Sequence, residues 1–209
     1  MIEDVFKNLS WLGHDCILYQ NKKTIYFDPF EIAGGPPADL ILISHDHFDH
    51  CSPDDVKKIH AKGTIIVTEA DSAKKFSGQV EVLKPGETKT IQGIPIETVP
   101  AYNTNKDFHP KMKGWLGFIV TLDGVRLYHP GDTDFIPEMK TIRADIAFLP
   151  VSGTYVMTAK EAVEAAKVLK PQIAVPIHYG AIVGSDEDAK EFKELLKGTV
   201  EVRILPKRQ

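Results

Sequence analysis

The chain contains few cysteines and no long apolar segment. Its two cysteines, Cys16 and Cys51, are too few for a disulfide framework, and we expect neither to take part in chemistry. No uninterrupted apolar run approaches the ~18 residues that a membrane span requires, so no membrane association is expected. The first ten residues carry Glu3, Asp4 and Lys7 where a signal peptide would have an apolar centre. We therefore expect a cytoplasmic protein.

The chain also has no excess of positive charge. Its 25 Lys and Arg against 29 Asp and Glu give a net charge of −4, so general electrostatic attraction to nucleic acid or anionic lipid is not expected. It contains no P-loop, no G-x-G-x-x-G segment and no low-complexity tract or linker. With 209 residues, of which 43% are hydrophobic and 26% charged, the composition fits one α/β domain over residues 1–209.

What the chain does have is a dense group of metal-ligand residue types. Residues 40–43 are apolar and predict a short buried strand, and residues 45–50 then contain three histidines and two aspartates. Buried imidazoles and carboxylates each need a partner, which a metal ion would supply. Ser52 and Pro53 then predict the start of a helix, which fixes the far end of the loop. The candidate ligands here are His45, His47, Asp49 and His50.

These residues resemble the H-x-H-x-D-H signature of the metallo-β-lactamase superfamily. Residues 129–134 resemble the Gly-Asp-Thr segment of that family, and residues 176–180 resemble its final histidine loop. Residues 11–15 and 25–29 look like the opening of the ascorbate-6-phosphate lactonase-like and N-acyl phosphatidylethanolamine phospholipase D-like branch. The resemblance implies an α/β fold, a four-layer αββα sandwich, with the ligands gathered at one edge of two paired sheets.

The resemblance also implies two divalent metal ions. Asp49, His50 and His178 are expected to hold one of them, and Asp132 is expected to lie between the two. Asp134 is an alternative to Asp132, but the match of Gly-Asp-Thr to residues 131–133 favours Asp132. We expect zinc, with manganese or iron as alternatives.

The other ion, bound by His45 and His47, has an uncertain third ligand. Where most of the superfamily has a histidine after the strand predicted at residues 94–99, this chain has Asn103, and His109 follows six residues later. Imidazole is the better zinc ligand, so we favour His109, while Asn103 or water in that place is the alternative. Asn103 and Lys111, which lie in this loop, are expected to contact the substrate.

Two residues near the start are expected to support the site. His14 stands in a Gly-His-Asp turn that the resemblance places near the metal, where it could act in catalysis or be structural. Asp28 ends a strand before Pro29, either as a turn residue or as a carboxylate that holds a ligand histidine.

The remaining pattern predicts mixed α/β structure with similar strand and helix stretches before and after residue 100. Thr158 and Glu161 form a predicted capping box ahead of a helix, and the first strands are predicted at residues 5–11, 16–20 and 23–27.

Two cations close together can lower the pKa of a shared water from ~15.7 toward ~7 and supply hydroxide at neutral pH. The sequence therefore predicts a metal-dependent hydrolase of a small lactone, ester or phosphodiester, with Asp49, Asp132 and His14 as catalytic candidates. The alternatives are an RNA or nucleotide phosphodiesterase, which the acidic balance disfavours, a di-iron oxidoreductase, and a non-catalytic metal-binding module. The di-iron variant commonly has a carboxylate in the place of His47.

Overall fold

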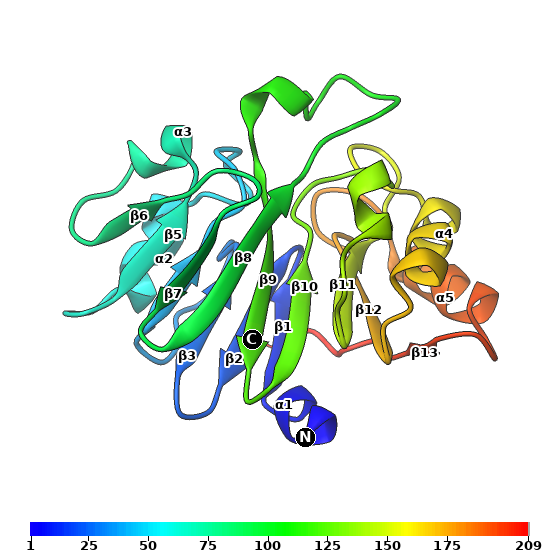
Figure 1. Ribbon diagram of the computed structural model, residues 1–209, viewed down its shortest axis with the longest axis horizontal. Coiled ribbons are helices and arrows are strands. Elements are labelled where there is room, and N and C mark those ends of the chain that lie inside the picture. Colours follow the sequence, from blue (N-terminus) through cyan, green and yellow to red (C-terminus); the bar gives the residue numbers. More distant parts are fainter. Residues whose placement is uncertain (209) are drawn as a thin grey trace.

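Two mixed β-sheets pack face to face in the computed structural model, which describes residues 1–208 (Figure 1). The first sheet has the order β1-β2-β3-β4-β5-β6, and the second has the order β13-β12-β11-β10-β9-β8-β7. The strands of the first sheet are β1 (Leu9–Gly13), β2 (Cys16–Gln20), β3 (Thr24–Phe27), β4 (Leu40–Leu42), β5 (Ile65–Thr68) and β6 (Val80–Val82). Those of the second are β7 (Thr88–Ile91), β8 (Ile94–Pro100), β9 (Leu116–Leu122), β10 (Val125–His129), β11 (Ile146–Pro150), β12 (Ile173–Ile177) and β13 (Glu201–Val202).

Each sheet begins as an antiparallel meander and continues as parallel strands. In the first sheet the pairs from β1 to β3 are antiparallel and those from β3 to β6 are parallel. The second sheet repeats this plan, antiparallel from β7 to β10 and parallel from β10 to β13. Parallel strands need crossover connections, and these carry most of the helices. The helices are α1 (Ile2–Phe6), α2 (Pro53–Ile59), α3 (Ala70–Ala73), α4 (Ala159–Leu169) and α5 (Asp186–Leu195), with short 3-10 turns η1 (Lys111–Lys113) and η2 (Pro137–Lys140).

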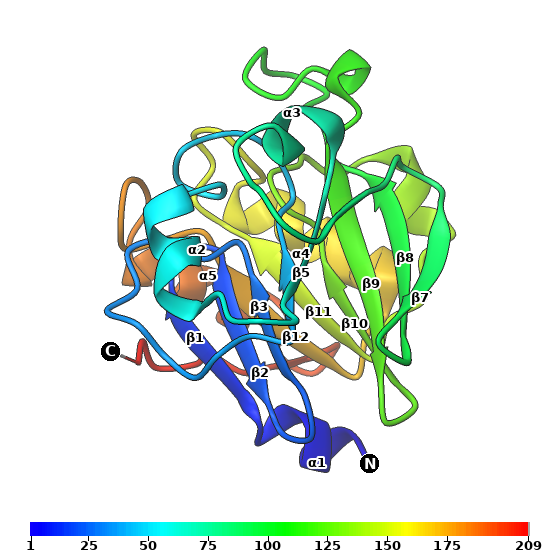
Figure 2. The ribbon, with the colours of Figure 1, turned by 90° about the vertical axis from the view of Figure 1, so that its left-hand side faces the viewer.

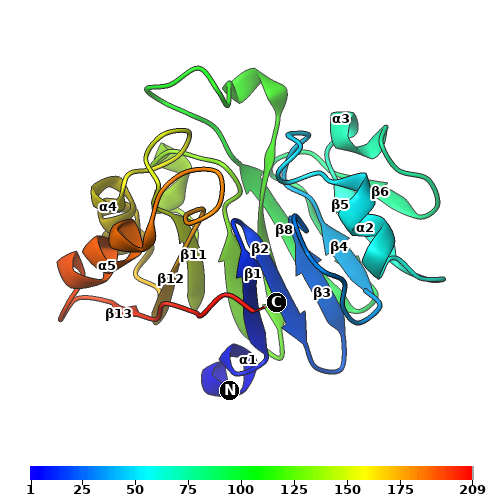
Figure 3. The same cartoon turned by 180° about the vertical axis from the view of Figure 1, so that it is seen from behind.

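The helices cover the outer faces of the two sheets. Figures 1 and 3 show α2 outside the first sheet, α4 and α5 outside the second, and the short α3 near the upper ends of β5 and β6. In Figure 2 α2 lies toward the viewer, and α4 and α5 lie behind the sheets. The apolar run of β4 follows from this position, because a strand covered on both faces is apolar throughout. Leu40 and Leu42 pack in the core between the sheets, whereas Ile41 and Ile43 pack under α2. The predicted four-layer αββα sandwich is thus confirmed.

The strand predicted for residues 5–11 is wrong in its first half. Residues Ile2–Phe6 form α1, and β1 begins only at Leu9. Ile2, Val5 and Phe6 lie at helical spacing and pack on the core, and two acids in the first turn favour the helix amino terminus. The predicted strand is therefore present only from Leu9 onward, as β1.

The loops that follow β4, β8, β10 and β12 lie along one edge of the sandwich, the upper edge in Figure 1. These loops carry the predicted ligand residues. None of the helices within residues 1–208 has the length and apolar character that a membrane crossing requires. That residues 1–209 form one domain stays a prediction.

Candidate metal centre

Asp28, at the end of β3, organises the loop that follows β4. Its carboxylate accepts hydrogen bonds from the Ser44 backbone N–H at 2.7 Å and from the Ser44 hydroxyl at 2.6 Å. It also accepts one from Nδ1 of His50 at 2.9 Å, and its side chain is fully buried. Of the two roles considered for Asp28, the structure therefore supports the carboxylate that holds a histidine. Because Nδ1 of His50 is used, Nε2 is left to face the site.

His45, His47 and His109 form the first cluster, in which one ligand atom from each lies within 4.8 Å of the others. The Ser44 hydroxyl donates to Asp28, so its oxygen accepts from Nδ1 of His45 at 2.8 Å. The neutral His45 ring therefore carries its proton on Nδ1 and presents the lone pair of Nε2. Burial lowers the pKa of His45 well below its ordinary value, and the nearby His50 lowers it further, so His45 is held in the neutral form that binds metal.

Asn103 holds His109 in this cluster. The amide nitrogen of Asn103 donates to Asp134 at 3.1 Å and to the Tyr155 carbonyl at 2.9 Å, which identifies the oxygen end of the side chain. That oxygen accepts from both the backbone N–H and Nδ1 of His109, each at 3.0 Å. The polar atoms of Asn103 are thus engaged by protein groups, and Nε2 of His109 points to the site. Contact of Asn103 with a substrate stays a prediction.

The second cluster contains His14, Asp49, His50 and His178. Nε2 of His14 lies 3.1 Å from Oδ2 of Asp49, and the ring centroids of His14 and His178 are 4.1 Å apart. Nδ1 of His178 lies 2.8 Å from the Ser152 hydroxyl. Asp49, His50 and His178 were expected together and His14 near them, and the structure places the buried His14 in direct contact with Asp49.

Asp132 lies between the two clusters. Its Oδ1 is 3.2 Å from Nε2 of His50 and 3.2 Å from Nε2 of His178, and its Oδ2 is 3.1 Å from Nε2 of His109. The preceding Gly131 has φ +61°, and a Cβ there would lie 2.7 Å from Cβ of Ser44, so the turn that delivers Asp132 requires glycine.

The orphaned atoms in this centre fit a metal ion. Nε2 of His50, His109 and His178 and Oδ1 of Asp132 are buried, yet none has the geometry of a hydrogen bond. Buried polar atoms are nearly always satisfied, so several such atoms aimed at a common region fit a cation-binding site. Imidazole nitrogen and carboxylate oxygen are also the donors that zinc takes in proteins.

The charges around Asp132 shift several pKa values. Burial alone would raise the pKa of Asp132, but His178 and His50 hold it well below the ordinary range. Burial would lower the pKa of His50 and of His178, but Asp132 opposes this and raises both above the ordinary value. Asp132 is therefore the negative centre of the site.

Other candidates lie outside this convergence. Lys111 is exposed and donates to Glu138 at 2.8 Å, so its expected substrate contact stays a prediction. Asp134 faces Asn103 and Lys106 instead of the histidines. Cys51 belongs to none of the potential ligand groups found within residues 1–208.

Asp15 is a buried carboxylate that was not predicted from the sequence. This residue is fully buried beside the site, with Oδ2 3.7 Å from Nδ1 of His50, and neither carboxylate oxygen has a hydrogen-bond partner. Burial raises its pKa. The only sequence signal was its position next to His14 in the same turn.

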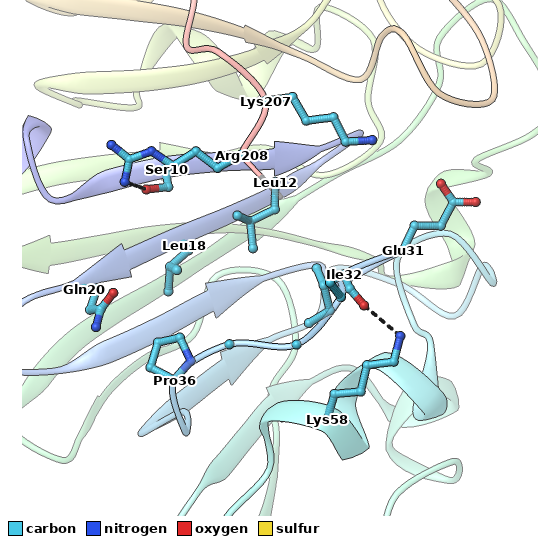
Figure 4. A pocket seen from close by; sticks show the side chains of 13 residues that line it. Ser10, Leu12, Leu18, Gln20, Glu31, Ile32, Pro36, Lys58, Lys207 and Arg208 are labelled. Carbon is cyan, nitrogen blue, oxygen red and sulfur yellow. Dashed lines mark hydrogen bonds between the residues drawn. The ribbon is translucent and has the colours of Figure 1, made fainter.

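The centre opens to solvent through a pocket of about 240 Å³, lined by His47, Phe48, Asp49, Phe108, His109, Asp132, Tyr155 and Ile182. A larger hollow of about 560 Å³ lies elsewhere, on the face of β1 and β2 that is turned toward α2 (Figure 4). Leu12 and Leu18 form its floor, and Lys58, Lys207 and Arg208 reach it from the sides. Among the described residues that line it there is no histidine, whereas the smaller pocket is lined by His47, Asp49, His109 and Asp132.

Comparison with known proteins agrees with this geometry. Residues 8–178 match the beta-lactamase superfamily domain. A UPF0173 metal-dependent hydrolase of Thermococcus kodakarensis is 35% identical over 216 residues, which cover 94% of this chain and 95% of that protein. One of Methanoculleus marisnigri is 33% identical over 207 residues, which cover 94% and 91%. A crystal structure from Parabacteroides distasonis, described as a metal-dependent hydrolase, is 38% identical with a TM-score of 0.87 and covers 96% of this chain and 93% of that one.

The chain shares this level of sequence identity with its relatives over nearly its full length. Its histidines and carboxylates also gather at one edge of the sheets, as a metal-dependent hydrolase requires. The chain belongs to the metallo-β-lactamase superfamily and, within it, to the UPF0173 metal-dependent hydrolases.

Proposed function

We propose that this metal-dependent hydrolase uses two divalent ions to cleave a small lactone, ester or phosphodiester, as in the lactonase-like and phospholipase D-like branch that its opening segment resembles. His45, His47 and His109 would hold one ion, Asp49, His50 and His178 would hold the other, and Asp132 would serve both. The observation that carries the proposal is the set of buried Nε2 atoms that surround Asp132 within 3.2 Å without hydrogen bonds. A small-molecule substrate in the cytoplasm, with neither nucleic acid nor membrane as partner, is part of this proposal.

Zinc is the ion that these donors favour. Five imidazoles and two carboxylates supply the nitrogen and oxygen ligands typical of catalytic zinc, with manganese or iron as alternatives. A pair of such ions would lower the pKa of a bound water toward ~7 and so make hydroxide available at neutral pH.

Asp49 is the residue placed to orient the attacking water. It lines the pocket, and its side chain is 14% exposed. Burial would raise its pKa, but the hydrogen bond from His14 and the charge of His50 lower it to about 2, so Asp49 is ionised at neutral pH. An ionised carboxylate at the mouth can accept a hydrogen bond from water and set its direction.

His14 acts through Asp49. It is 1% exposed, so it lies behind the pocket, and its Nε2 fixes Oδ2 of Asp49 at 3.1 Å. We therefore assign His14 the role of positioning the Asp49 carboxylate.

The proposal is tested by assaying zinc-loaded protein on a lactone, a carboxylic ester and a phosphodiester. Asp132→Ala should lower kcat/KM by about 100-fold or more and should reduce the bound metal, because its carboxylate serves both ions. Asp54→Ala, on the exposed first turn of α2, is the matched control and should behave as wild type. Equal activity in wild type and Asp132→Ala would overturn the mechanism.

A further inference from the structure

Three large hydrophobic side chains are exposed around the mouth of the metal centre. Phe48 is 68% exposed, Phe108 51% and Ile182 42%, and all three line the pocket that holds Asp49 and Asp132. They come from three separate loops, after β4, after β8 and after β12. Exposed apolar side chains that gather around a polar centre mark a surface that is covered when a ligand binds.

Contacts with other rings hold the two phenylalanines in place. Phe48 packs edge to face on Phe30, with ring centroids 5.8 Å apart, and Phe108 packs edge to face on Tyr155 at 4.7 Å. Each such aromatic contact has a preferred geometry. The apolar walls of the pocket are therefore preorganised.

The lysines near the mouth are already paired. Lys106 binds Asp134 at 2.6 Å and Lys111 binds Glu138 at 2.8 Å. The charged groups among the residues that line the pocket are the histidines and carboxylates of the centre itself. A phosphate or carboxylate on the substrate beyond reach of the metal ions would need a guanidinium or ammonium partner, and neither Lys nor Arg lines this pocket within the described chain.

We propose, on the basis of the proposed function, that the site selects substrates with a neutral apolar acyl or aryl group beside the bond that is cleaved. The metal centre would hold the reacting carbonyl group, and Phe48, Phe108 and Ile182 would cover the apolar group. The pocket of about 240 Å³ has room for roughly eight non-hydrogen atoms at ~30 Å³ each.

Binding of alkanehydroxamic acids to the zinc-loaded protein tests this without turnover. Affinity should rise about four-fold per methylene from the acetyl to the hexanoyl compound. A compound of equal length with a terminal carboxylate should bind more weakly. Phe48→Ser and Phe108→Ser should flatten the dependence on chain length at unchanged zinc content, while Leu195→Ser, which changes an exposed apolar residue on α5, should not.

The outcomes separate this inference from the proposed function. Affinity independent of chain length, or tighter binding of the acid-tailed compound, would overturn the inference even if lactones and esters are hydrolysed. The expected length dependence without hydrolysis of any lactone, ester or phosphodiester would support it and overturn the proposed reaction. Failure of the protein to bind zinc or manganese would overturn both.

Discussion

Asn103 holds His109 in the first cluster through two hydrogen bonds. It stands at the position where the superfamily usually has a histidine, and it accepts two hydrogen bonds from His109. Asp134 and Tyr155 hold its amide in the orientation that this requires. Of the two alternatives for the third ligand of the first ion, this geometry favours His109.

Replacing Asn103 should therefore weaken metal binding at one ion. Asn103→Ala removes the acceptor for Nδ1 of His109, so we expect the affinity for one of two zinc ions to fall by about 10- to 100-fold. Titration with zinc against a competing chelator measures this. Asn105→Ala, an exposed neighbour in the same loop, is the control and should bind both ions as wild type does. Unchanged affinity in Asn103→Ala would show that His109 needs no such support.

The amide at position 103 could be recognised from the sequence as a departure from the family pattern, but its role could not. The Asn103 backbone N–H donates to the His109 carbonyl at 2.7 Å and closes the loop, while Asp134 and Tyr155, from distant segments, fix the orientation of the amide. Asp15 shows the same limit, because its position next to His14 does not predict that its carboxylate would be buried without a hydrogen-bond partner.

The helix α2 anchors the loop that precedes β4. Its Asp55 accepts hydrogen bonds from the backbone N–H groups of Glu31 at 3.0 Å and Ile32 at 3.2 Å. The Ser52 hydroxyl and Lys58 donate to the same carboxylate, which is mostly buried. One side chain thus joins the start of the helix to residues 31–32.

Loss of this carboxylate should destabilise the fold. Asp55→Ala leaves backbone donors without partners, so we expect the free energy of unfolding to fall by about 1–3 kcal/mol. Asp54→Ala, exposed in the same helical turn, should change it by less than about 0.5 kcal/mol. Urea denaturation of both variants measures the difference. Equal stability of the two would mean that Asp55 contributes nothing beyond the first-turn charge.

Local signals predicted most of the helices and strands. The Ser52 cap and the capping box of Thr158 and Glu161 are present as predicted, since both depend on residues three apart in the chain. The error at residues 5–11 arose because α1 spans only five residues and is stabilised by packing on the core. The face-to-face packing of the two sheets depends on tertiary contacts, which local signals do not predict. It was expected only because of the family resemblance.

The metal centre joins the two sheets of the sandwich. The candidate ligands between His45 and His50 follow β4 of one sheet. His109, Asp132 and His178 follow strands of the other sheet. Ions bound here would therefore connect both halves of the fold and stabilise it against unfolding.

This stabilisation should depend on pH. The pKa values of His50 and His178 are raised in the metal-free protein, so the stability that their protonated forms contribute is complete below about pH 6.5 and is lost as the pH rises through the raised values. Metal binding requires the neutral rings and releases these protons, so affinity increases with pH. The difference in Tm between zinc-loaded and metal-free protein should widen from about pH 6 to pH 8.

Thermal unfolding with zinc and with a chelator, at several pH values, measures this difference. A His60→Ala variant, with an exposed histidine outside the site, should show the same pH dependence as wild type. A difference in Tm that narrows with rising pH would contradict the assignment of His50 and His178 as ligands.

The most direct test is anomalous X-ray diffraction at the zinc edge from crystals grown with excess zinc. We expect two peaks at one edge of the sandwich, one among His45, His47 and His109 and the other among Asp49, His50 and His178, with Asp132 in contact with both. If the crystals contain zinc but no anomalous peak lies among these residues, the proposed metal centre is contradicted.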